Sequence, residues 1–240
     1  MYAEKITLSE RVLHLIETHG NVANPIAETH AFVKEVLAPA PERYDMTYRY
    51  EHTLRVAFKG KQIAEGEGWN GEPLIIACLL HDVGYPECAD FQDLKRHPAI
   101  SAAIAERFLQ KLSYDKKLSE SICLAVAIHD KWNDLPENVT PFELSVRDAD
   151  DLDRFDLMRI CVLGNSDIGE RSAAELISVC EKRLTSVEDS HSRICGTQTA
   201  KNLWEEELKM RRRFYERLKD QTENTCRMEQ FLCTLSERQR

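Results

Sequence analysis

The sequence predicts an all-α protein: a bundle of helices with a helical extension at its C-terminal end. Through most of the 240 residues, apolar side chains recur at the three-to-four-residue spacing of amphipathic helices. No segment shows the sustained apolar–polar alternation that is typical of a half-buried strand. Proline and glycine fall between the periodic segments, where they would end one helix or begin the next. Together these observations favour a fold made only of helices.

The N-terminal third contains three expected helices. Residues 6–18 form an amphipathic segment, and residues 24–37 form a second one. Pro39 and Pro41 then mark a loop. A third helix is expected over about residues 48–65 and would end at the glycines that follow it.

The next helix should lie at the centre of the fold. Pro73 begins a short segment that is apolar on every side and that ends at His81–Gly84. The stretch 85–96 has mixed charge and is expected to be an irregular loop. Pro98 suits the first position of a helix, which would place His97 at the helix start.

The remaining helices follow at shorter intervals. They are expected at about residues 98–112 and 117–130, from Pro141 through an acidic cluster, at 172–185, and at 197–236. The last of these is expected as one long charged helix or as a broken pair. The chain shows no internal repeat and no clear linker, so we expect one domain over residues 1–240. Its core would cover about 24–190, and its C-terminal helical extension about 197–236.

Composition limits the partners of the protein. The formal net charge of −9 disfavours a nucleic-acid backbone, because proteins that bind it present basic surfaces. A phosphorylated small molecule is compatible with this charge, since bound metal ions can supply positive charge locally. The apolar content of 42% is typical of a folded globular protein.

The cysteine pattern and the lengths of the apolar runs indicate where in the cell the protein is expected. None of the eight cysteines forms a CxxC pair, and several, such as Cys78 and Cys180, lie in apolar runs. The N-terminus lacks the apolar core of a signal peptide. The longest apolar run, Leu74–Leu80, is far shorter than the ~20 residues that span a bilayer. We therefore expect a cytoplasmic protein that does not bind membranes.

The functional signal is an ordered set of metal-binding residue types. A single histidine on an apolar helix face is usually a satisfied core residue, but four such positions with an adjacent His–Asp pair are hard to explain in that way. Because only two members are adjacent, the others must converge in space from different helices. The members are His52, His81, Asp82, His97, His129 and Asp150.

Helix geometry predicts which of these side chains point inward. At 100° per residue, His52 shares a stripe with Val56 and Ile63, and His97 and His129 likewise align with apolar neighbours. Each histidine should therefore face the core.

The same geometry separates the aspartates of the cluster 148–153. Asp150 and Asp153 fall on its apolar face, where an uncompensated carboxylate costs several kcal/mol. Asp150 is therefore expected to bind a cation, and Asp153 to bind a cation or to support a ligand. Asp148 and Asp151 are expected on the opposite, solvated face.

These residues resemble the HD superfamily of metal-dependent phosphohydrolases. The resemblance rests on His52 with Arg55 and Val56 behind it, on Leu-Leu-His-Asp-Val-Gly at 79–84, and on Asp-Ala-Asp-Asp-Leu-Asp at 148–153. It covers roughly residues 45–165. The tail also looks similar, more loosely, to the C-terminal helical segment of a bacterial HD subfamily with nucleotide pyrophosphohydrolase members.

The resemblance implies an all-α bundle with a metal centre. By analogy, His52, His81, Asp82 and Asp150 would bind one divalent ion, while His97 and His129 would complete a second site bridged by Asp82. Mixed imidazole and carboxylate ligands suit Mn²⁺, Fe²⁺, Co²⁺ or Zn²⁺, as one or two ions. Many relatives carry an acidic residue or a lysine shortly after the motif, where this chain has Tyr85.

The implied activity is hydrolysis of phosphate esters or anhydrides, with nucleotides as the favoured substrates, by water that a metal ion activates. Asp82 is the expected catalytic residue. The candidates for binding substrate phosphate are Arg55, Lys95, Arg96 and Lys131. Two alternatives stay open: a di-iron HD oxygenase, and a catalytically silent nucleotide-binding HD module. The apolar face of the tail suits a homodimer.

Overall fold

The protein is described here from a computed structural model, which defines residues 6–20, 24–38, 46–89, 93–131, 134–158 and 171–237. These residues form α-helices, short 3-10 helices and turns, and no strand occurs among them. The predicted all-α class is therefore confirmed. The chain divides into two compact units, Met1–Asp153 with Cys195–Lys201 and Arg154–Ile194 with Asn202–Arg240. The single domain over 1–240 stays a prediction.

The first unit begins with α1 (Glu10–Thr18), α2 (Pro25–Val36) and α3 (Met46–Glu67). The predicted start of α1 at residue 6 is wrong, because the Ser9 side chain caps the helix by accepting a hydrogen bond from the Val12 amide. Ser9 is held in turn by Glu87, which accepts hydrogen bonds from its amide at 2.6 Å and from its hydroxyl at 2.7 Å. The predicted loop at Pro39 and Pro41 lies outside the described residues.

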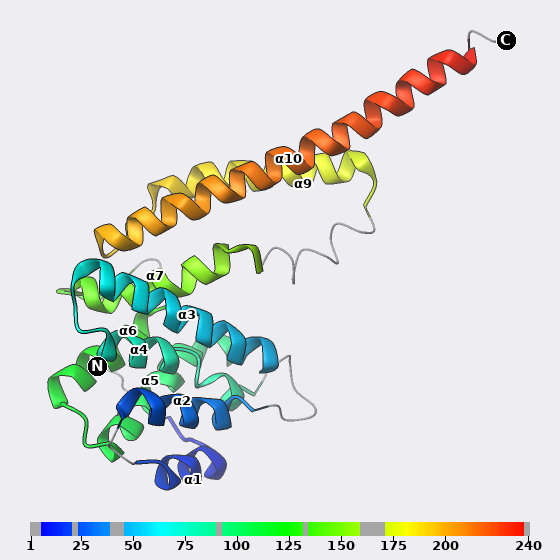
Figure 1. Ribbon diagram of the computed structural model, residues 1–240. Helices are drawn as coiled ribbons and strands as arrows, with labels where there is room; N and C mark the ends of the chain where they lie inside the picture. The colour runs from blue at the N-terminus through cyan, green and yellow to red at the C-terminus, as the bar shows by residue number, and fades with distance from the viewer. Residues whose placement is uncertain are drawn as a thin grey trace. The chain divides into compact units, whose positions relative to one another are not determined.

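The short apolar helix α4 (Gly71–Leu80) is the centre of the first unit, as predicted. It packs against α2, α3, α5 and α6, which surround it in Figure 1. Most of its side chains are fully buried. It starts two residues before Pro73 because the Asn70 side chain caps it, accepting from the Glu72 amide at 3.2 Å.

Two antiparallel helices follow α4. The stretch expected as a loop contains the 3-10 turns η1 (Tyr85–Glu87) and η2 (Asp93–Arg96). The helix α5 (His97–Lys111) begins at His97, as predicted, and packs on α6 (Lys116–Ile128). The acidic cluster lies on α7 (Pro141–Phe155).

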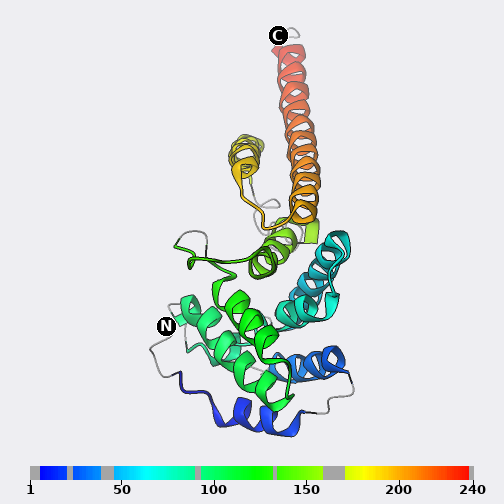
Figure 2. The same ribbon diagram turned by 90° about the vertical axis from the view of Figure 1, so that its left-hand side faces the viewer.

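The second unit contains α9 (Ala173–Asp189), η3 (Ser190–Ser192) and, from Asn202 onward, the long helix α10 (Gln198–Glu237). The tail is therefore one long helix, not a broken pair. The two helices cross in Figure 1, and Figure 2 shows α9 nearly end-on beside α10. Ion pairs link Lys219 with Glu181 at 2.8 Å and Arg212 with Glu188. Since the later residue of α10 pairs with the earlier residue of α9, the two helices run in opposite directions.

One apolar cluster joins α9 and α10. It consists of Cys180, Tyr215, Leu176, Leu184, Phe214 and Leu218. Near the end of α10, four large apolar side chains are exposed: Met228, Phe231, Leu232 and Leu235. The homodimer through this helix stays a prediction. Within the described residues, no helix combines the length and the apolar character needed to cross a bilayer.

Candidate metal centre

The six predicted ligands meet inside the first unit, mostly from helix ends. His81 caps the C-terminal end of α4, His129 caps that of α6, and His97 is the first residue of α5. His52 lies within α3 and Asp150 within α7. None of the six is more than 2% exposed. The structure thus brings together the complete set that the sequence predicts.

Asp82 lies at the middle of this cluster, with its two oxygens turned to different histidines. Oδ2 is 3.3 Å from Nε2 of His81 and 3.6 Å from Nε2 of His52. Oδ1 is 3.3 Å from Nε2 of His97 and 3.5 Å from Nε2 of His129. One carboxylate therefore faces two pairs of imidazoles at once.

The arrangement fits divalent metal ions. Two groups of side chains have ligand atoms within 4.8 Å of one another, namely His52 with His81 and Asp150, and His81 with Asp82 and His129. Oδ1 of Asp82 is buried and, within the described chain, accepts no well-formed hydrogen bond. A buried carboxylate oxygen surrounded by imidazole nitrogens is the donor set that divalent transition metals prefer.

Three of the histidines are oriented by their own backbone. In each, Nδ1 lies within hydrogen-bonding distance of the carbonyl oxygen three residues earlier, so Nδ1 must carry the proton and Nε2 is left as the basic nitrogen facing the cluster. The pairs are His81 with Cys78 at 2.7 Å, His97 with Leu94 at 2.6 Å, and His129 with Val126 at 2.7 Å.

His52 is oriented differently, by a carboxylate. Its Nδ1 lies 2.6 Å from Oδ2 of Asp153, and Nε of Arg55 donates to Oδ1 of the same carboxylate at 2.6 Å. Asp153 therefore supports a ligand, which is one of the two roles expected for it. Arg55 is bound to Asp153, and its role in binding substrate phosphate stays a prediction.

The charges of the cluster shift the pKa values of its members. Burial lowers the pKa of His52, but hydrogen bonds to Asp150 and Asp153 outweigh it and raise the value to about 9. Burial raises the pKa of Asp82, yet the neighbouring charges of His81 and Arg49 hold it well below its usual range. Asp82 is therefore a carboxylate at neutral pH.

Arg49 is the site residue that sequence reasoning missed. Its Nη1 donates to Oδ2 of Asp82 at 2.6 Å, and its side chain is only 15% exposed. The signal in the sequence was its spacing, since Arg49 precedes His52 by three residues on one helix and so lies on the same face. The guanidinium also lies over the ring of Tyr85, 3.7 Å from its centroid.

The other predicted phosphate-binding residues lie on the surface. Lys95, Arg96 and Lys131 are exposed, and Arg96 pairs with Asp93 at 2.8 Å. They flank His97 and His129 in sequence without entering the buried cluster. Their contact with a substrate stays a prediction.

The solvated face predicted for the acidic cluster is wrong. Asp148 and Asp151 are each only 2% exposed. Asp148 accepts a hydrogen bond of 2.7 Å from the amide of Gly196, whose backbone approaches α7 so closely that an added Cβ would lie 2.7 Å from Leu144. A helix wheel considers one helix only. It cannot predict that the backbone at Gly196, almost 50 residues later in the chain, packs against this side of α7.

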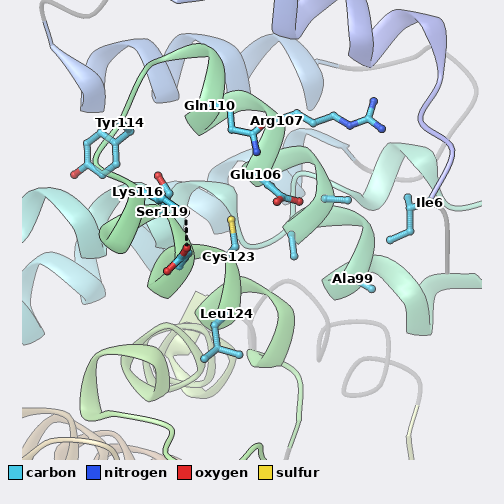
Figure 3. A pocket seen from close by; sticks show the side chains of 13 residues that line it. Ile6, Ala99, Glu106, Arg107, Gln110, Tyr114, Lys116, Ser119, Cys123 and Leu124 are labelled. Carbon is cyan, nitrogen blue, oxygen red and sulfur yellow. Dashed lines mark ion pairs between the residues drawn. The ribbon is translucent and has the colours of Figure 1, made fainter. Parts of the chain in front are cut away.

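A separate cavity of about 560 Å³ lies along α5 and α6, away from the metal ligands. Figure 3 shows its walls, which include Arg107, Gln110, Tyr114, Ser119, Cys123 and Leu124. None of the six candidate ligands lines it. The cavity therefore does not belong to the candidate metal centre.

Comparison with known proteins agrees with this geometry. Residues 49–158 match the family model of the HD domain. Among solved structures, a predicted HD superfamily hydrolase from an uncultured Thermotogales bacterium is similar, with a TM-score of 0.56 and 22% identity over 81% of this chain and 91% of that one. At this identity the likeness concerns the fold. No curated protein matches the sequence.

Proposed function

Because residues 49–158 of this chain form an HD domain, we propose that the protein is a metal-dependent phosphohydrolase. Its substrates would be phosphate esters or anhydrides, with nucleotides as the favoured class. The residues that would hold the metal are His52, His81, Asp82, His97, His129 and Asp150. When bound, divalent ions there would supply a nucleophilic water at neutral pH and charge stabilisation for a phosphoryl group.

The observation that carries the proposal is the position of Asp82. Its oxygens face His52 and His81 on one side and His97 and His129 on the other. A carboxylate with two such faces could be shared between two divalent ions, which together would supply the charge stabilisation that in-line displacement at phosphorus requires. We therefore favour two ions over one.

The chain also supplies a cation for the substrate. Phosphoryl transfer depends mainly on positioning and on neutralising charge at the phosphoryl oxygens. Arg49 is held beside Asp82 and is mostly buried. Since a guanidinium has five N–H donors, one contact with Asp82 leaves others for a phosphoryl oxygen. We therefore assign Arg49 to the substrate phosphate, ahead of the exposed Lys95 and Arg96.

Release of phosphate and pyrophosphate from a panel of nucleotides tests the function. Protein loaded with Mn²⁺ should hydrolyse at least one member, and Asp82→Ala should lose that activity together with its metal. Asp220→Ala is a matched control, because Asp220 is exposed on α10 in the second unit. Its activity should equal that of the wild type. Failure of the metal-loaded wild type on every substrate would reject the proposal and direct attention to oxygen consumption by the iron-loaded protein.

A further inference from the structure

Tyr85 contacts two residues of the metal centre that come from different helices. The guanidinium carbon of Arg49, on α3, lies 3.7 Å from the centroid of the Tyr85 ring. The imidazole of His97, at the start of α5, lies 4.3 Å from it, centroid to centroid, with the rings tilted by 42°. Tyr85 is not itself a metal ligand, so these contacts need another explanation.

The backbone holds Tyr85 firmly in this place. Its amide donates to the carbonyl oxygen of Asp82 at 3.1 Å. The preceding residue, Gly84, donates its amide to the Ser101 hydroxyl at 2.8 Å, and an added Cβ on Gly84 would lie 2.6 Å from the Ser101 amide nitrogen. The chain before Tyr85 is thus pressed against the first turns of α5, which places the ring beside His97.

Arg49, in contrast, is a long side chain with several rotatable bonds, and holding it in one orientation costs conformational entropy. A cation over an aromatic face gains electrostatic attraction, and the flat guanidinium also stacks on the ring. A ring whose backbone is hydrogen-bonded in place and whose side chain packs on His97 can therefore restrict Arg49 before any substrate arrives. Such preorganisation favours binding, because less freedom remains to be lost.

We propose that Tyr85 is a positioning residue that holds Arg49 in the orientation in which its guanidinium binds the phosphoryl group of the substrate. The Tyr85 ring is held in turn by its contact with the His97 imidazole. This role rests on the proposed function. It adds that Tyr85, through Arg49, increases the affinity of the site for phosphate.

The test compares Tyr85→Leu with Tyr85→Phe in the full chain loaded with Mn²⁺. Calorimetry measures binding of inorganic phosphate, and steady-state kinetics measures KM and kcat on the best nucleotide of the panel. Tyr85→Leu should weaken phosphate binding and raise KM by about tenfold, while kcat falls less than threefold. Tyr85→Phe keeps the aromatic face and should stay within about twofold of the wild type in all three quantities.

Tyr114→Leu is the matched control. Tyr114 lies between α5 and α6 at the separate cavity of Figure 3, where its hydroxyl donates to Glu72 at 3.0 Å. Its loss can reduce thermal stability, but it should leave phosphate binding unchanged. Equal melting temperatures and metal contents for Tyr85→Leu and Tyr85→Phe would exclude a general structural defect as the cause of the difference between them.

A double-mutant cycle separates positioning from direct contact. In an Arg49→Met background, Tyr85→Leu should cost less than about twofold in phosphate affinity, because the cation that the ring positions is already gone. Wild-type phosphate affinity in Tyr85→Leu, or a full tenfold loss in the Arg49→Met background, would overturn the inference. These results would leave the proposed function intact, since only a wild type that is inactive on the whole panel rejects that function.

Discussion

The two halves of the candidate metal centre orient their histidines in different ways. In the first half, formed by His52, His81 and Asp150, His81 is held by its own backbone. His52, in contrast, is held by the Asp153 carboxylate, 101 residues away. In the second half, formed by His97 and His129, each histidine is held by a carbonyl oxygen three residues earlier. The second half thus depends on local helix-end geometry alone, whereas the first also depends, through His52, on tertiary packing of α7 against α3.

This difference has a chemical consequence. A carboxylate on Nδ1 makes an imidazole more basic than a neutral carbonyl does, which strengthens it as a metal ligand but also as a proton acceptor. In the first half, therefore, a proton can compete with the metal ion for His52, and substitution of Asp153 can weaken metal binding. No single side-chain substitution can remove the carbonyl partners of the second half.

The largest expected effect separates two neighbouring aspartates of α7. Asp150→Asn should abolish activity and reduce metal content, because Asp150 lies in the first half with Oδ1 at 3.1 Å from Nε2 of His52. Asp148→Asn should retain metal and activity but unfold at a lower temperature, because it weakens the buried contact with Gly196. Metal analysis and thermal melts of both variants check this. Equal loss of metal in the two variants would show that the cluster is wider than the six ligands.

A smaller effect is expected from the partner of His52. Asp153→Asn should lower Mn²⁺ affinity by about 10–100-fold, because the His52 ring loses the group that fixes its tautomer and raises its basicity. Isothermal titration of the metal-free protein with Mn²⁺ measures the change. Arg55→Lys keeps the carboxylate on His52 and should have a smaller effect. An affinity for Mn²⁺ that is identical in Asp153→Asn and the wild type would remove the distinction between the halves.

The smallest expected effect concerns pH. In the metal-free protein the pKa of His52 is raised from 6.5 to about 9, so protonated His52 stabilises the fold fully below pH 6.5, and this contribution is lost as pH rises through 9. The melting temperature of the metal-free protein should therefore fall across this interval, while Mn²⁺ affinity rises, because the ion needs neutral His52. In Asp153→Asn both changes should move to lower pH. A wild-type melting temperature that is flat over this range would contradict the assignment.

Sequence reasoning recovered the parts of the site that helix periodicity and residue type determine. The inward faces of His52, His97 and His129 follow from the apolar stripes on their own helices, and the central position of α4 follows from its composition. The failures came from contacts between segments. The burial of Asp148 depends on the returning backbone at Gly196.

The use of Arg49 and Tyr85 depends on packing that no single helix reveals. Arg49 shares a helix face with His52, but only the fold places its guanidinium between Asp82 and the Tyr85 ring. The capping of α1 by Ser9 was visible in the sequence as a residue type, whereas its contact with Glu87 was not. Local patterns therefore predicted the ligands, and tertiary structure was needed for the residues that support them.

The most direct test of the account is the number of metal ions per chain after equilibrium dialysis against Mn²⁺, measured by mass spectrometry of the metal. If Asp82 joins the two halves, the wild type should hold two ions, His129→Ala one, and Asp82→Ala none. A wild type that holds a single ion unaffected by His129→Ala would contradict the two-sided centre. An Asp82→Ala variant with full metal content would contradict the central role of Asp82 itself.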